Sequence, residues 1–308
     1  MGTIALTGAT GLLGASLVPR LLAAGHELRI LVRPRPGERR VAKKGITFVE
    51  GYLDEVAPID ELVRGVDCIV HAAYAKPEDA RQGLGSTTEQ WLQANFMGTM
   101  RLLERAVDTP GRQLIYTSSL AVFSSSPDHD PLGERFVRDE TFPLWPREFY
   151  GSLRAACEKL LITSSVTYGL NTSVWRLGCV FGLRTPLHES PLYPVVDEAV
   201  RTGEVRTRTG TYAIAVDDAA AILAGAVGDA SVKGQVTNVF DRWIDHATVA
   251  PEIAKCLERP VRNLAEPVPE PRSPIRGDTL RARFQNFTTD EAIRTLVAQL
   301  VERCRERV

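Results

Sequence analysis

Short apolar runs and longer amphipathic segments alternate along most of the chain. The short runs have the length of buried strands, and the segments between them carry apolar residues three and four positions apart, as helices do. This alternation predicts an α/β fold with a parallel sheet. The expected strands are residues 3–6, 28–32, 46–49, 68–70, 113–117, 171–176, 212–216 and 235–239. The expected helices are residues 12–24, 59–63, 88–108, a segment that begins near 149–150, 195–201, 217–227, 248–258 and 290–307.

Three glycines spaced three apart follow the first expected strand, in Thr7-Gly8-Ala9-Thr10-Gly11-Leu12-Leu13-Gly14. Gly8 allows a sharp turn, Gly11 lets a diphosphate approach the main chain, and Gly14 lets the next helix pack closely on the strand. The N–H groups that begin the helix then bind phosphate. The spacing also fits a simple glycine turn. The position between a strand and a helix favours a dinucleotide site.

The second expected strand ends at Val32 and is followed by Arg33. An acidic residue at this place accepts hydrogen bonds from the adenosine ribose, whereas an arginine favours the 2′-phosphate of NADP. Arg33 therefore predicts NADP, with NAD as the second choice. The alternative is a solvated basic loop, because charge runs are usually exposed. Further basic residues follow at Arg35, Arg39, Arg40, Lys43 and Lys44.

Two later polar positions, one at a strand end and one on a helix face turned toward the sheet, are candidates for roles near the cofactor. His71 ends a strand and is followed by the small residues Ala72 and Ala73, which leave space for a ligand to cross the strand end. We interpret His71 as a hydrogen-bonded structural group. Asn95 lies among apolar neighbours in a long helix and needs polar partners. It is expected either to brace backbone near the cofactor or to act as a buried cap.

Composition excludes several classes of function. The 37 basic and 38 acidic side chains give a net charge of −1, which offers no attraction for nucleic acid or an anionic membrane. We find no membrane-length apolar run and no charged-then-apolar leader. The five cysteines form no Cys-x-x-Cys pair, which favours reduced thiols and a cytoplasmic protein. The histidines lack metal-ligand spacing, and hydrolase and zinc-protease motifs are missing, so we expect no metal.

With Ser119, Tyr150 and Arg154, the sequence resembles the extended short-chain dehydrogenase/reductase family. This family includes NAD-dependent epimerase/dehydratases, dihydroflavonol reductases and related carbonyl reductases. The resemblance covers roughly residues 3–240. Its motifs occur in order as Thr7 to Gly14, His71-Ala72-Ala73, Asn95-x-x-Gly98-Thr99, Ile115-Tyr116-Thr117-Ser118-Ser119-x-x-Val122-Phe123, Arg176-x-x-x-Val180-Phe181-Gly182 and Val216-Asp217-Asp218.

The resemblance implies a doubly wound parallel sheet, the Rossmann fold, with a smaller C-terminal substrate lobe. Residues 1–176 and 211–240 would form the dinucleotide-binding domain, and residues 177–210 and 241–308 the lobe. A small-molecule substrate is implied as the partner, and a homodimer is compatible with the resemblance. The implied cofactor-binding residues are Gly8, Thr10, Gly11, Leu12, Leu13, Arg33, Leu53, Ala72, Ala73, Asn95, Thr117, Tyr150 and Arg154.

In the family, a tyrosine and a lysine at Tyr-x-x-x-Lys spacing act with a serine or threonine on a substrate carbonyl. By resemblance, Tyr150 exchanges the proton, Ser119 holds the substrate oxygen, and the cation also bonds the nicotinamide ribose. A free tyrosine, with a pKa of about 10, is a poor base at neutral pH, so a cation one helical turn away helps by stabilising phenolate. Here the lysine position is Arg154, which supplies the charge but cannot relay a proton.

The sequence thus predicts an NADP-dependent oxidoreductase that acts on a ketone or secondary alcohol of a small organic molecule. A nucleotide-sugar epimerase, dehydratase or ketoreductase is the first alternative. Cys179 and Thr211 oppose it, because they stand where nucleotide-sugar enzymes commonly carry a diphosphate-gripping asparagine and arginine, although Arg206 and Arg208 are near enough in sequence to substitute. A cofactor-sensing protein without turnover is the second alternative, because of Arg154.

Overall fold

The structure is a computed structural model that describes residues 1–34, 44–76, 87–123 and 136–306. The chain divides into two compact units. The first contains Met1–Ser125, Pro143–Arg176 and Ala220–Thr237, and the second contains Ser126–Phe142, Leu177–Ala219 and Asn238–Val308.

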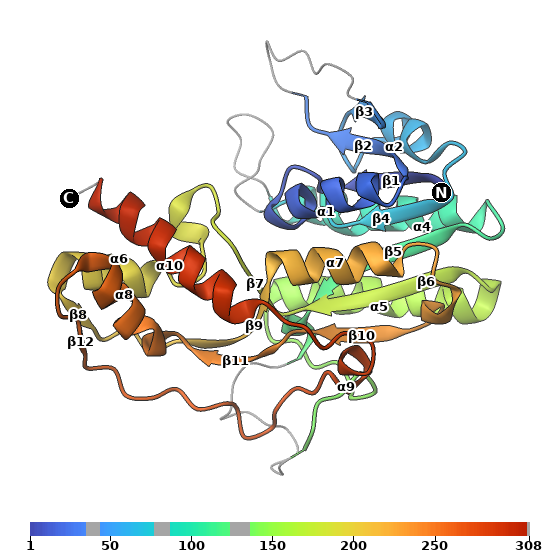
Figure 1. Cartoon of the computed structure of the whole chain (residues 1–308). Coiled ribbons are helices and arrows are strands. Elements are labelled where there is room, and N and C mark those ends of the chain that lie inside the picture. The colour runs from blue at the N-terminus through green and yellow to red at the C-terminus, as the bar shows by residue number, and fades with distance from the viewer. Residues whose placement is uncertain (35–43, 77–86, 124–135, 307–308) are drawn as a thin grey trace. The chain divides into compact units, whose positions relative to one another are not determined.

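A seven-stranded sheet forms the centre of the fold, with the strand order β10-β6-β5-β4-β1-β2-β3 (Figure 1). Strand β1 pairs in parallel with both neighbours, so that Ile4 lies opposite Leu28 on one side and Cys68 on the other. The strand order reverses between β1 and β4, and ligands bind at such a reversal in open α/β sheets. The expected doubly wound α/β fold is confirmed. The strands are β1 Thr3–Thr7, β2 Glu27–Val32, β3 Ile46–Glu50, β4 Cys68–His71, β5 Gln113–Ser119, β6 Asn171–Leu177 and β10 Val236–Val239.

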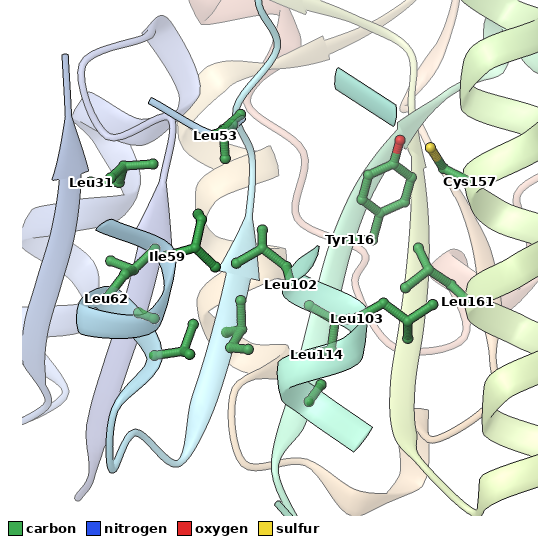
Figure 2. Close-up of a cluster of buried hydrophobic side chains, with 14 of the residues drawn as sticks. Leu31, Leu53, Ile59, Leu62, Leu102, Leu103, Leu114, Tyr116, Cys157 and Leu161 are labelled. Atoms are coloured by element: carbon green, nitrogen blue, oxygen red, sulfur yellow. The ribbon is translucent and has the colours of Figure 1, made fainter. Parts of the chain in front are cut away.

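Helices pack on both faces of this sheet (Figure 1). On one face, Leu62, Leu102 and Leu161 come from three different helices and join Leu114 and Tyr116 of β5 in one buried cluster (Figure 2). Burying each such side chain contributes about 1.5–3 kcal/mol. The helices are α1 Leu12–Ala23, α2 Val56–Val63, α4 Gly98–Val107, α5 Phe149–Tyr168 and α7 Val216–Ala226.

The segment predicted as one helix over residues 88–108 contains a change of winding. Helix α3, Thr88–Leu92, leads into a π-helical turn, Gln93–Met97, before α4 begins. Two side-chain hydrogen bonds engage carbonyl groups here: Asn95 Nδ2 donates to Trp91 O at 2.9 Å, and Thr99 Oγ1 donates to Asn95 O at 2.6 Å. Side chains that bond nearby carbonyls compete with the regular helical ladder, and π turns often mark functional sites.

The second unit has its own core, in which helices α6 and α10 bury Val196 and Leu300. Its three-stranded sheet has the order β11-β9-β7. Of these strands, only the region of β9 was predicted, because the others have three or four residues and give weak periodicity. The elements are β7 Cys179–Phe181, α6 Tyr193–Thr202, β8 Glu204–Val205, β9 Gly210–Ala215, β11 Arg242–Asp245, α8 Ala250–Leu257, β12 Arg262–Asn263, α9 Asp278–Arg281 and α10 Thr289–Arg305.

A buried ion pair attaches helix α5 to strand β6. Glu158 accepts from Arg176 Nε at 3.0 Å and from Nη2 at 2.9 Å, and the two side chains are 2% and 4% exposed. The Arg176 guanidinium also lies 5.0 Å from the centre of the Phe123 ring. Burial raises the pKa of Glu158, and the charge and hydrogen bonds of Arg176 act against that rise. The pair fixes the helix that carries Tyr150 and Arg154.

We expect Glu158→Gln to lower the free energy of unfolding by about 3–5 kcal/mol, because it leaves the buried Arg176 charge without a counter-ion. Glu306→Gln is the matched control, since Glu306 pairs with Arg303 at 3.4 Å on the exposed surface and should change stability by less than about 1 kcal/mol. Urea unfolding of the two variants measures both effects. Equal losses would contradict the role assigned to the buried pair.

Candidate active site

The turn after β1 is closed by backbone contact with the end of β4. Gly8 has a φ of +80°, and a Cβ at this position would lie 2.5 Å from the Ala72 carbonyl carbon and oxygen. Both facts require glycine. Gly14 packs against this turn, since a Cβ there would lie 2.2 Å from Gly8 O. The turn and the first helix are therefore one rigid piece at the switch point of the sheet.

The N-terminus of α1 is left open to a ligand. Its N-cap is Gly11, and a Cβ there would contact nothing closer than Gly8 O at 3.4 Å. Within the described residues, no side chain caps these N–H groups and the first turn holds no acidic residue. Thr10 and Gly11 are exposed, and Leu12 and Leu13 are half-buried. An uncapped helix N-terminus with close backbone access fits the diphosphate of a dinucleotide.

A chain of hydrogen bonds crosses from β1 to α4 through His71. Thr99 Oγ1 donates to Asn95 O, so it accepts from His71 Nε2 at 2.9 Å. His71 Nδ1 then has a free lone pair and accepts from Thr7 Oγ1 at 2.7 Å, and Thr7 Oγ1 accepts from the backbone N of Ala73. The polarity of the chain assigns the Nε2–H tautomer to His71.

Burial, followed by the charge of Arg154, lowers the pKa of His71 to about 3. His71 is therefore neutral at physiological pH and bonded at both ring nitrogens, which is the structural role expected from the sequence. Thr117 adds a further link, because its hydroxyl donates to His71 O at 3.2 Å.

Asn95 holds the segment that follows β4. Its Oδ1 accepts from Ala75 N and its Nδ2 donates to Ala75 O, both at 2.9 Å. This is the backbone-bracing arrangement, and the Asn95 side chain acts through the segment that it supports. Leu53, another expected cofactor residue, is 8% exposed and lies in the hydrophobic core, where a Cβ on Gly98 would touch its side chain at 2.8 Å.

Close packing of backbone brings the ends of β5 and α5 together. Ser119 ends β5, and its Oγ accepts from Ala121 N at 3.2 Å. Tyr150 is the second residue of α5, and a Cβ on the adjacent Gly151 would lie 2.1 Å from Ala121 O. The first turn of α5 therefore lies directly on the short 3₁₀ helix Leu120–Val122 that follows Ser119. Both Ser119 and Tyr150 are half-buried.

Arg154 is enclosed by three tyrosine rings. Its Cζ lies 5.1 Å from the ring centre of Tyr74, 5.5 Å from Tyr116 and 5.2 Å from Tyr150. Its Nη1 donates to Tyr116 Oη at 3.0 Å and to Thr117 O at 3.1 Å. Burial opposes the guanidinium charge, but the phenol groups of Tyr116 and Tyr150 outweigh it, so the pKa of Arg154 is raised. Arg154 thus keeps its charge against the Tyr150 ring.

Arg154 Nε is buried, and no described residue accepts a hydrogen bond from it. A buried unsatisfied donor costs about 1–3 kcal/mol.

Sequence reasoning gave no role to Tyr74, Tyr116 or Trp91. Tyr74 contacts Tyr150 edge-on at 4.9 Å between ring centres, and Trp91 contacts both Tyr74 and Phe149. Tyr116 lies inside the quoted serine-strand motif, and Tyr74 directly follows Ala73. The positions of Tyr116 and Tyr74 beside recognised motifs were the available signal. No pattern among neighbouring residues shows that the two rings contact Arg154.

Arg33 is exposed directly after β2. Arg35, Arg39, Arg40 and Lys43, which belong to the same expected basic loop, lie outside the described residues. In the second unit, the Cys179 thiol is hydrogen-bonded to the Thr211 hydroxyl. Arg206 pairs with Glu204 and Arg208 with Glu266, each at 2.8 Å.

Across the described parts of the chain, no group of three or more His, Cys, Asp or Glu residues comes together in a way that could hold a metal ion. The same parts contain no helix with the length and apolar character needed to cross a bilayer.

Residues 4–239 match the model of the NAD dependent epimerase/dehydratase family. A 4-hydroxy-2-methyl-3-oxo-4-farnesyl-3,4-dihydroquinoline-1-oxide ketoreductase of Stigmatella aurantiaca is 29% identical over 203 residues, which are 65% of this chain and 56% of the ketoreductase. The chain thus spans little more than half of that relative. A UDP-glucose 4-epimerase of Lacticaseibacillus casei is 29% identical over 262 residues, 77% of this chain and 76% of the epimerase.

The fold is also that of a crystallised UDP-glucose 4-epimerase of Thermus thermophilus in complex with NAD. The TM-score is 0.70 at 22% identity, with 99% of this chain and all of the other covered. At 22% identity this similarity shows that the two proteins share a fold.

The neutral state of His71 makes stability depend on pH. Between pH 6.5 and about 3 the unfolded chain binds a proton at His71 that the folded chain does not, so stability falls as the pH is lowered. The slope from this group is at most about 1.4 kcal/mol per pH unit. We expect the free energy of unfolding of His71→Gln, measured with urea, to change less between pH 5 and 6.5 than that of the wild type. The exposed His188, changed to Gln, is the control and should keep the wild-type slope. A wild-type slope in His71→Gln would refute the assignment.

Proposed function

Since the chain belongs to the NAD dependent epimerase/dehydratase family, we propose that it is an NAD(P)-dependent oxidoreductase acting on a ketone or secondary alcohol of a small organic molecule. The observation that carries this proposal is the charged guanidinium of Arg154 lying 5.2 Å from the Tyr150 ring centre, within the unit that also contains the uncapped N-terminus of α1.

The chain's own residues suit the binding of a dinucleotide. The N–H groups that begin α1, beside Gly8 and Gly11, would hold the diphosphate. Arg154 Nε would bond a ribose oxygen, and Arg33 would bond the 2′-phosphate of NADP. When bound, the nicotinamide supplies or accepts the hydride.

The remaining chemistry is the proton that a carbonyl oxygen must gain or an alcohol must lose. Tyr150 would exchange that proton through its phenol, and Ser119 would hold the substrate oxygen by a hydrogen bond. Arg154 would stabilise the phenolate form of Tyr150 by its charge while taking no proton itself, since an arginine stays protonated in proteins.

A nucleotide-sugar epimerase or dehydratase is the second candidate, favoured by the match to the Lacticaseibacillus casei epimerase over 77% of the chain. Two side chains count against it, because Cys179 and Thr211 are uncharged and stand where a diphosphate-gripping asparagine and arginine are common. Arg206 and Arg208 form exposed ion pairs with Glu204 and Glu266. Exposed pairs contribute less than about 1 kcal/mol, so these arginines stay candidates for a diphosphate.

Tyr150→Phe is expected to lower the turnover number by about 10²–10⁴-fold, the usual contribution of a positioned general acid or base. Cofactor affinity should stay nearly unchanged. Tyr168→Phe, which removes a phenol from the exposed end of the same helix, is the matched control and should keep wild-type turnover. Turnover that survives Tyr150→Phe would assign the proton transfer to another group. If the wild type turns over no substrate but binds cofactor, the sensor alternative gains support.

Arg33→Asp is expected to reverse a preference for NADP over NAD. The charge-assisted contact represents about 1.5–3 kcal/mol, or roughly a tenfold to hundredfold change in affinity. Arg64→Asp changes the net charge equally at another exposed position and serves as the control. Fluorescence titration with both cofactors measures the ratio, and equal wild-type affinities would rule out the preference.

A further inference from the structure

The buried residue Tyr116, to which the sequence analysis gave no role, accepts a hydrogen bond from Arg154. Arg154 Nη1 donates both to Tyr116 Oη, at 3.0 Å, and to Thr117 O, at 3.1 Å. Tyr116 is 1% exposed and Arg154 is 6% exposed, so water does not compete for these bonds. One terminal nitrogen of the guanidinium is therefore attached to strand β5, whereas Tyr150 belongs to helix α5.

Tyr116 is itself fixed in place. Its ring lies in the core cluster that also contains Leu114 and Leu161, and its hydroxyl points toward the Cys157 sulfur (Figure 2). Cys157 is three residues beyond Arg154 on the same helix. The phenol oxygen is thus a rigid acceptor for Arg154.

A guanidinium can bond β5 through one nitrogen while the rest of its plane lies against Tyr150. A lysine ammonium has a single nitrogen, which cannot bond strand β5 and lie against the Tyr150 ring at the same time. We propose that Tyr116 is a positioning residue: its hydroxyl anchors Nη1 of Arg154, so that an arginine works beside Tyr150. This inference rests on the proposed oxidoreductase function, because it assigns a role to a group of the same site.

A double-mutant cycle tests the proposal with Tyr116→Phe, Arg154→Lys and the double variant. Tyr116→Phe alone should lower kcat by about 10- to 100-fold and change KM by less than about threefold, because the hydroxyl orients the cation without touching substrate. In the Arg154→Lys background the same change should alter kcat by less than about threefold, since an ammonium that lies beside Tyr150 cannot also bond Tyr116. Tyr168→Phe should be without effect in both backgrounds.

Equal losses from Tyr116→Phe in the two backgrounds would overturn the proposal, because a merely structural phenol acts independently of residue 154. No loss in the wild-type background would overturn it as well. Thermal unfolding of all four proteins shows whether each is folded.

Cofactor affinity, measured by fluorescence titration of the same proteins, provides a readout that needs no turnover. Tyr116→Phe should weaken binding about threefold to tenfold with Arg154 present and not with lysine. If no ketone or alcohol is turned over but this coupling is found, the proposed function fails and the anchoring of Arg154 stands. Affinities that combine additively would reject the anchoring.

Discussion

The contact of Gly8 with the Ala72 carbonyl is the constraint on which the arrangement of the site depends. It joins the turn after β1 to the end of β4 with no side chain between them. Gly14 then seats α1 on the same turn, so the helix N-terminus is fixed at the place where the strand order reverses. Any larger residue at Gly8 would separate β1 from β4 and displace the N–H groups that suit a diphosphate.

The hydrogen-bond chain through His71 extends this constraint from the sheet to the helix behind it. Thr7, His71 and Thr99 come from β1, β4 and α4, and each bond fixes the donor and acceptor roles of the next group. A protonated His71 would have no lone pair to accept the hydrogen bond from Thr7. The hydrogen-bond geometry thus requires the neutral imidazole that the lowered pKa of His71 also favours. Asn95 continues the bracing to Ala75 and thereby supports the segment that contains Tyr74.

Local signals predicted the sheet and the turn because strand length, helix period and glycine spacing are properties of neighbouring residues. The sequence also indicated Tyr150 and Arg154 together, since they stand four positions apart, about one turn, on one helix. It did not reveal that Glu158 pairs with Arg176 or that Arg154 meets Tyr116, because those partners are 18 and 38 residues away. The two- to four-residue strands of the second unit were missed because such short runs have no measurable periodicity.

The enclosure of Arg154 explains how an arginine fits at a place where the family pattern has lysine. A guanidinium is planar and weakly hydrated, so the three nearby tyrosine rings stabilise it, whereas an ammonium would lose more hydration on entering the same space. Because Arg154 is only 6% exposed, its terminal nitrogen needs acceptors inside the protein. The phenol of Tyr116 and the carbonyl of Thr117 supply those acceptors on β5. The guanidinium is thus held by strand β5 as well as by the helix that bears it.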